Sequence, residues 1–162
     1  MAKEKSNLAP GMVCKHRNFT NLFCLVCIES KKEMVFTPSS NWEFAFVAYV
    51  VNMKTRTGKF EVIDDYSWVQ LTHEQTEKQP FNFNKNIEEI MAQVTRFQIH
   101  RGYTNKEKGN IIYITSIKYS DGFFLHCGFH YPGGKRLSYG IMRSLKYEDW
   151  HEMTEEQSKK LF

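Results

Sequence analysis

The sequence has no hydrophobic run long enough to cross a membrane and no apolar N-terminal segment of the secretory type. It also has no glycine-rich phosphate loop, no nucleophile elbow and no catalytic-triad spacing. We therefore expect a cytoplasmic protein that uses no cofactor, no small-molecule substrate and no membrane. The sequence gives no case for an enzyme.

Cysteine is scarce, with four in 162 residues, and a reducing cytosol would keep these thiols free. Three of them lie with a histidine in CKHRNFTNLFCLVC (14–27), which supplies the four soft ligands of a structural zinc site. However, LFCLVCI has no glycine for a metal knuckle, and residues three apart on a strand point to opposite faces. We favour buried cysteines that act as small hydrophobes. A zinc-stabilised N-terminal module remains the alternative, with the ligands Cys14, His16, Cys24 and Cys27.

Two further groups of reactive side chains are interpreted as structural. In HCGFH (126–130), His126 and Cys127 are neighbours on a strand, so their side chains diverge. His126 and His130 share a face but lie roughly 13 Å apart, too far for one metal. Asp64 and Asp65 have no further acidic partners nearby, which favours a solvated turn.

Aromatic residues and alternating charge are what the sequence has in quantity. Thirteen Phe and eight Tyr favour strands. Lys/Arg and Asp/Glu number seven and three in residues 13–60 (+4) and one and five in 61–78 (−4). They number nine and two in 95–147 (+7) and two and five in 148–162 (−3). This basic–acidic order occurs twice, which points to an internal repeat.

The closing segments of the two halves align without a gap. SWVQLTHEQTEK (67–78) matches DWHEMTEEQSKK (149–160), which places Trp68 over Trp150. Both copies have Thr three residues before Gln, a spacing that predicts a capped helical turn at the end of each unit.

Four shorter blocks upstream align in the same order. We align KHRN (15–18) with IHRG (99–102), NLFCLV (21–26) with GNIIYI (109–114), FAFVAYV (44–50) with FFLHCGF (123–129), and TGK (57–59) with GGK (133–135). This alignment places Gln98, Ile112 and Thr115 where the first unit has its three clustered cysteines. A fold that the two units share therefore does not need zinc.

Each unit is predicted to be a small barrel of short strands joined by turns of Gly, Asn, Pro and Ser. The predicted strands are 12–17, 22–28, 43–52 and 59–63 in the first unit and 96–101, 110–118, 122–131 and 136–143 in the second. Between the units, apolar residues at 87, 90, 91 and 94 predict a helix within 82–94, with Asn86 and Glu89 as its capping box. The expected organisation is residues 1–80, a helical linker at 81–94, and residues 95–162.

The opening of the first unit, APGMVCKHRNFTNLFCLV, resembles the start of the SH3-like barrels of KOW and related domains. The resemblance covers residues 10–76, with 95–156 as a weaker copy that has TRFQIHRG in place of the Pro-Gly entry. It implies a mainly β protein with two tandem SH3-like (KOW-type) barrels joined by a short helix-containing linker.

The length, tandem arrangement and basic charge further resemble early DNA-binding proteins of T-even phages that modify transcription. That resemblance implies largely non-specific binding of host and phage double-stranded DNA. It also implies association with the nucleoid of an infected bacterium and an effect on transcription. Two alternatives stay open: an RNA-binding KOW protein, and an adaptor that docks on host RNA polymerase or on another nucleic-acid-binding protein such as a nucleoid protein.

Basic residues in the barrel segments and their turns are the expected contacts to DNA phosphates. Tyr103, Tyr131 and Tyr139 lie near them in the sequence and would stack on bases of a single strand. The candidate nucleic-acid-binding residues are Lys15, Arg17, Lys54, Arg56, Lys59, Arg96, Arg101, Lys106, Lys108, Lys135, Arg136, Arg143 and Lys146.

The charge distribution predicts that a basic pair in the second unit contributes more to DNA binding than a basic pair in the first. Lys135→Glu with Arg136→Glu should weaken binding to a random-sequence duplex more than Lys54→Glu with Arg56→Glu, because residues 95–147 carry the larger positive charge. Equilibrium titration of both double variants at one salt concentration makes the comparison. Equal or reversed losses would contradict the prediction.

Overall fold

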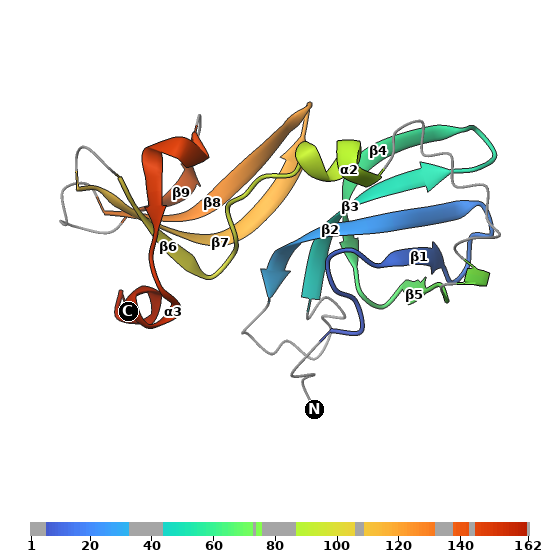
Figure 1. Ribbon diagram of the computed structural model, residues 1–162, viewed down its shortest axis with the longest axis horizontal. Coiled ribbons are helices and arrows are strands. Elements are labelled where there is room, and N and C mark those ends of the chain that lie inside the picture. The colour runs from blue at the N-terminus through green and yellow to red at the C-terminus, as the bar shows by residue number, and fades with distance from the viewer. Residues whose placement is uncertain are drawn as a thin grey trace. The chain divides into compact units, whose positions relative to one another are not determined.

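The computed structural model describes residues 6–32, 44–72, 74–75, 87–105, 109–131, 138–142 and 145–161. The chain divides into two compact units, Met1–Val94 and Thr95–Phe162, and each is built on a five-stranded antiparallel sheet (Figure 1). The prediction of a mainly β protein is confirmed at this level. Within the described part of the chain, no helix is long and apolar enough to span a membrane.

The first unit contains β1 (Val13–His16), β2 (Leu22–Lys32), β3 (Phe44–Asn52), β4 (Thr57–Asp64) and β5 (Trp68–Gln70), in the spatial order β4-β3-β2-β1-β5. Side-chain hydrogen bonds stabilise the turn between β3 and β4. The Asn52 side-chain oxygen accepts from the backbone N–H groups of Lys54 and Thr55 between β3 and β4. Such side-chain-to-backbone bonds favour turns over continued strand. The short helix α2 (Ile87–Ala92) follows, with Ile90 buried.

The second unit repeats this arrangement. It contains β6 (Arg101–Asn105), β7 (Ile111–Ser120), β8 (Phe123–Tyr131), β9 (Ser138–Met142) and β10 (Trp150–Glu152), in the order β10-β6-β7-β8-β9. Asp121 and Gly122 both have positive φ, as a two-residue hairpin turn between β7 and β8 requires. The 3-10 turn η2 (Tyr147–Asp149) precedes β10, and the helix α3 (Glu155–Lys159) follows it.

Most predicted elements are confirmed, and two kinds of error stand out. The strand predicted at 96–101 is wrong, because β6 begins at Arg101. The short strands β5 and β10 were not predicted; they lie inside the closing segments. The predicted capping turns are present, with reciprocal Thr–Gln hydrogen bonds at 72/75 and 154/157. Residues 82–86, including Asn86 of the predicted linker cap, lie outside the described residues.

Strand pairing corrects the alignment of the two entry strands. Cys14 on β1 lies opposite Gln70, and Tyr103 on β6 lies opposite Glu152. Since Gln70 and Glu152 occupy the same place in the aligned closing segments, the counterpart of Cys14 is Tyr103 rather than Gln98. By the same pairing, His16 corresponds to Asn105 and not to His100.

His100 instead takes the place of the entry glycine. Gly11 has φ 95° and donates its N–H to the Val26 carbonyl at 2.8 Å. His100 has φ 58° and donates to the Ile114 carbonyl at 2.6 Å. Val26 and Ile114 are equivalent in the predicted alignment, so both units enter the sheet through a residue in the left-handed conformation. The His-Arg dipeptide shared by the two units had led the sequence alignment to match the entry strands β1 and β6 out of register.

The second strands of the units align as predicted. Their pairing with the next strand shifts at Cys27 in β2 and at Thr115 in β7, which are equivalent positions. Immediately before these bulges in β2 and β7, Val26 lies opposite Ala48 and Ile114 lies opposite Gly128. Ala48 is therefore equivalent to Gly128, and the predicted β3/β8 alignment is wrong by one residue. The predicted TGK/GGK match falls on 133–135, outside the described residues.

One face of the first sheet forms its core. Leu8, Cys14, Cys24, Val26, Phe44, Phe46, Ala48, Val50, Ile63 and Trp68 pack there as one buried cluster. In the second unit, Tyr103 is fully buried, its ring centroid lies 4.9 Å from that of Phe97, and its hydroxyl accepts from the Gln98 N–H at 2.8 Å. This aromatic pair fills volume where the first unit has a cysteine.

Two glycines with open space around their Cβ positions allow the effect of backbone strain on stability to be measured without a change in packing. Gly11→Ala should lower the free energy of unfolding by about 1–2 kcal/mol, because φ 95° is unfavourable for an L-residue. Gly140→Ala, where φ is ordinary and no atom lies within 4 Å, should leave stability unchanged or slightly raised. Urea denaturation of both variants tests this; equal losses would contradict it.

Candidate nucleic-acid interface

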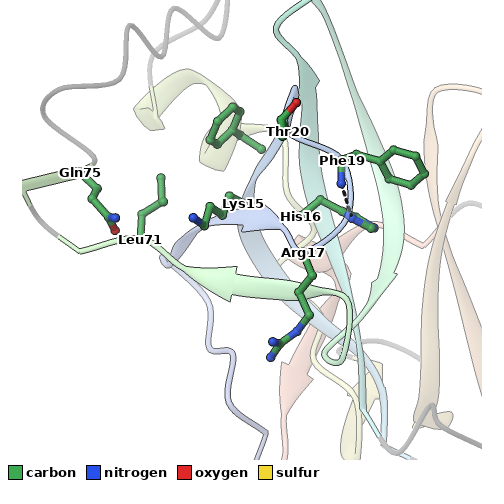
Figure 2. Close-up of a pocket in the computed structure, with 8 residues that line it drawn as sticks. Lys15, His16, Arg17, Phe19, Thr20, Leu71 and Gln75 are labelled. Carbon is green, nitrogen blue, oxygen red and sulfur yellow. Dashed lines mark hydrogen bonds between the residues drawn. The ribbon is translucent and has the colours of Figure 1, made fainter.

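A groove of about 270 Å³ lies on the first unit beside the turn between β1 and β2. Figure 2 shows it with residues from that turn on one side and residues of the closing segment on the other. Among the described residues, none of those that line it is a carboxylate: Lys15, His16, Arg17, Phe19, Thr20, Phe23, Leu71 and Gln75. Two cations that the sequence predicted, Lys15 and Arg17, therefore meet in one place.

Strand alternation puts Lys15 in this groove. Its neighbour Cys14 is fully buried in the core, so Lys15 lies on the other face of β1, where it pairs with Phe23 of β2 and Val69 of β5. Lys15 is exposed, and within the described part of the chain no ion pair neutralises it. Its ammonium is therefore available to an incoming anion.

The turn that carries the groove is organised by His16. Its Nδ1 accepts from the backbone N–H groups of Asn18 at 3.0 Å and Phe19 at 3.3 Å. Its ring packs against Phe19 and Trp68, with centroids 4.8 and 5.0 Å apart. His16 thus stabilises the conformation of the turn through these hydrogen bonds and ring contacts.

The two groove cations differ in whether neighbouring residues hold the side chain in place. Arg17 donates from Nε to the Tyr66 carbonyl at 2.6 Å and lies over the Tyr66 ring at 5.8 Å. In Figure 2, the Lys15 side chain is directed toward Leu71 and Gln75, whereas the Arg17 side chain runs away from them. Arg17 is anchored and contributes its charge at the rim, and Lys15 is the cation inside.

Other predicted cations in the first unit lie along the β3–β4 hairpin. Lys54 and Arg56 are exposed on its turn, and Arg56 has φ 56°. Lys59 on β4 forms an ion pair with Glu61 at 2.9 Å, and this hydrogen-bonded carboxylate raises the pKa of Lys59. Lys59 is therefore already neutralised by its neighbour.

Of the predicted cations of the second unit, the structure describes three: Arg96, Arg101 and Lys146. Arg96 lies over the Tyr147 ring at 5.7 Å, and Lys146, which precedes Tyr147 in the chain, is exposed. Arg101 is half-buried, 3.6 Å from Glu152, and donates to the Met153 carbonyl, which makes it a structural residue. The remaining predicted cations lie outside the described residues: Lys106, Lys108, Lys135, Arg136 and Arg143.

Of the three tyrosines expected to stack on bases, one is excluded. Tyr103 is fully buried, so that prediction is wrong; burial also raises the pKa of Tyr103 to about 12. Tyr131 is half-buried and donates its hydroxyl to the Leu161 carbonyl at 3.1 Å. Tyr139 is 62% exposed and remains available.

Five residues that line the groove were not predicted as site residues: Phe19, Thr20, Phe23, Leu71 and Gln75. Phe19 is 60% exposed although it is aromatic. Its signal was a lone Phe in a polar turn, Arg-Asn-Phe-Thr-Asn, where a core residue is not expected. Gln75 had been assigned only its capping role, which it also fulfils.

The cysteine cluster is packed as core. Cys14 and Cys24 lie opposite each other on β1 and β2, both fully buried. Cys27, at the bulge, donates from Sγ to the Leu25 carbonyl, and burial raises its pKa to about 11. Within the described residues, no group of three or more His, Cys, Asp or Glu side chains is placed to hold a metal ion.

The acidic pair and the buried histidine also have structural partners. Asp64 accepts from the Ser67 N–H and hydroxyl, both at 2.9 Å. Asp65 is only 2% exposed and accepts from the Ser6 hydroxyl, so the predicted solvated turn is wrong for Asp65. His126 is buried, hydrogen-bonded through Nε2 to the Thr95 hydroxyl at 2.7 Å, and burial lowers its pKa to about 4.

The buried neutral His126 predicts an acid-labile second unit. Its folded pKa lies below the unfolded value near 6.5, so the unfolded state binds the extra proton between pH 6.5 and 4. The free energy of unfolding should fall by about 1.4 kcal/mol per pH unit across that window. His126→Phe, which copies the equivalent Phe46, should flatten this slope in denaturation at several pH values. An unchanged slope would contradict it.

Comparison with known proteins found no match among family models, curated proteins or solved structures. The resemblance to KOW-type barrels therefore stays a prediction from the sequence. The groove and its cations are features of this chain's own residues.

Proposed function

We propose that this chain binds double-stranded DNA with little sequence preference, through cationic surfaces and without catalysing a reaction. The observation that carries the proposal is the groove on the first unit, whose described lining contains two cations and no carboxylate. A carboxylate at that place would repel a phosphate and neutralise Lys15. Its absence leaves a net positive hollow that also contains a hydroxyl, from Thr20, and an amide, from Gln75.

These groups suit phosphate oxygens better than base edges. The Lys15 ammonium is a point charge with three rotatable donors, and the Thr20 hydroxyl is a neutral donor. Contacts of this kind neutralise the DNA backbone and release counterions, but they carry no sequence information. The exposed Phe19 adds an apolar contact to sugar or base at the rim.

Two similar units on one chain strengthen weak binding. Binding through phosphate contacts from one small unit is expected to be weak and to fall steeply with salt. Once one unit is bound, the linker holds the second at a high effective concentration near the same duplex. The shared strand order and the equivalent bulges support two SH3-like (KOW-type) barrels as the finer fold. An action on the nucleoid and on transcription during phage infection belongs to the same proposal.

Two lysines on the first unit give a matched test. Lys15→Ala should weaken binding to a labelled random-sequence duplex and lower the slope of log affinity against log salt by about 0.9, the value for one lost phosphate contact. Lys59→Ala should leave both quantities unchanged, because Glu61 already pairs with that ammonium. Fluorescence anisotropy across a salt series measures both.

Competitors identify the polymer. Unlabelled duplex DNA should displace the probe better than RNA or single-stranded DNA of the same length. Better displacement by RNA would replace the proposal with RNA binding. No binding at low salt would overturn nucleic-acid binding and favour the adaptor function.

A further inference from the structure

The second unit has a groove of its own, of about 340 Å³. Pockets for small organic groups range from roughly 300 to 1,000 Å³. The groove is lined from β7 and β8 and from both edge strands of the sheet, β9 and β10. Its lining residues are Asn110, Ile112, Gly128, His130, Ser138, Tyr139, Gly140, Ile141, Met142, Leu145 and Trp150.

This groove is the counterpart of the first unit's core. By strand register and the aligned closing segments, Ile112, Gly128, His130, Met142 and Trp150 correspond to Cys24, Ala48, Val50, Ile63 and Trp68. The first-unit residues of this set all belong to one buried cluster. In the second unit, the same positions line an open hollow. Among the described residues, the face that the first unit fills with side chains is therefore less filled in the second.

A pair of glycines forms a strip without side chains on the groove wall. Gly128 and Gly140 lie directly opposite each other on β8 and β9. Their counterparts are Ala48 and Glu61, which also face each other. A Cβ at Gly128 would collide with the Tyr113 carbonyl, so the backbone requires glycine there. A Cβ at Gly140 would meet nothing within 4 Å, so packing does not require glycine at that position.

The lining suits a flat, uncharged heteroaromatic ring. Trp150 offers an aromatic side chain to the groove. Tyr139 borders the groove from β9, but its ring packs against Phe129 on the other face of the sheet, with centroids 5.1 Å apart. His130 and Ser138 offer hydrogen-bonding groups, and among the residues that the structure describes no carboxylate, lysine or arginine lines the groove. Within the part of the chain that is described, no hydrogen bond engages the His130 ring or the Ser138 hydroxyl. The neutral groove lies in a segment, 95–147, that carries +7 overall.

We propose that this groove binds one unpaired nucleobase, stacked on an aromatic side chain and hydrogen-bonded through its edge. The positive surroundings would hold the adjoining phosphates while the neutral groove accepts the base. This inference deepens the proposed DNA binding and rests on it for the source of the base. The base site itself is testable without DNA.

Free nucleosides test the groove directly. Titration of the full chain with adenosine or thymidine should give saturable quenching of tryptophan emission, because Trp150 lines the site. Gly140→Leu should abolish the saturable part, because the new side chain fills the groove without a backbone clash. Glu61→Leu, the same side chain at the equivalent position of the first unit, should retain it.

A duplex with one unpaired nucleotide tests the link to DNA. The wild-type chain should bind it roughly tenfold more tightly than the fully paired duplex, the scale of one stacked base. Gly140→Leu should lose this preference and keep its affinity for the paired duplex. Loss of all duplex binding in Gly140→Leu would contradict a separate base site.

The outcomes separate the two proposals. Absence of saturable quenching by nucleosides overturns the base site, whether or not duplex DNA binds. Saturable quenching by an extended apolar peptide but not by nucleosides overturns it in favour of protein docking. Nucleoside binding without any duplex binding keeps the base site and overturns the proposed function alone.

Discussion

The β-bulge on the second strand of each unit decides which side chains face the core. At Cys27 and at Thr115 one extra residue shifts the pairing with the next strand. Because side chains alternate along a strand, this shift sets the inward residues of β3 and β8 relative to β2 and β7. It places Val47 opposite Ile28 in one unit and Cys127 opposite Ser116 in the other. The contents of both cores follow from that pairing.

The two units share this strand pairing but differ in which face of the sheet carries a groove. The first unit seals its inner face with apolar side chains and carries its groove outside, where Lys15 and Arg17 meet. The second unit replaces Ala48 and Glu61 by Gly128 and Gly140 and opens its inner face into a neutral groove. One groove suits a phosphate and the other a base. A duplicated fold has thus acquired two kinds of surface that suit different parts of a nucleotide.

Local patterns predicted much of this fold, and pairing between distant strands explains the misses. Apolar runs located β2, β3, β7 and β8, and the Thr–Gln spacing located both capping turns. His100 could not be identified as the counterpart of Gly11, because a left-handed residue is usually glycine and the His-Arg letters favoured another alignment. The one-residue error between β3 and β8 arose because the connections before them differ in length, Lys32 to Phe44 against Ser120 to Phe123, so the position of the gap is not fixed by the sequence.

The candidate site was predictable only in part, for a similar reason. Lys15 and Arg17 were identified by charge, and alternation with the buried Cys14 directs Lys15 outward. Charge alone could not show that Glu61 neutralises Lys59 or that Glu152 and the Met153 carbonyl engage Arg101. Tyr103 was placed among candidate stacking residues because it lies near basic residues in the sequence. Its burial against Phe97 depends on a sheet register that the sequence did not reveal.

Backbone amide NMR of the full chain, with and without a random-sequence duplex, tests the central claim most directly. Binding through the first groove predicts shifts concentrated at residues 15–20 and at Gln75 at low salt, fading as salt is raised. No shifts at low salt would contradict DNA binding. Shifts that leave residues 15–20 unchanged would contradict the assignment of the groove.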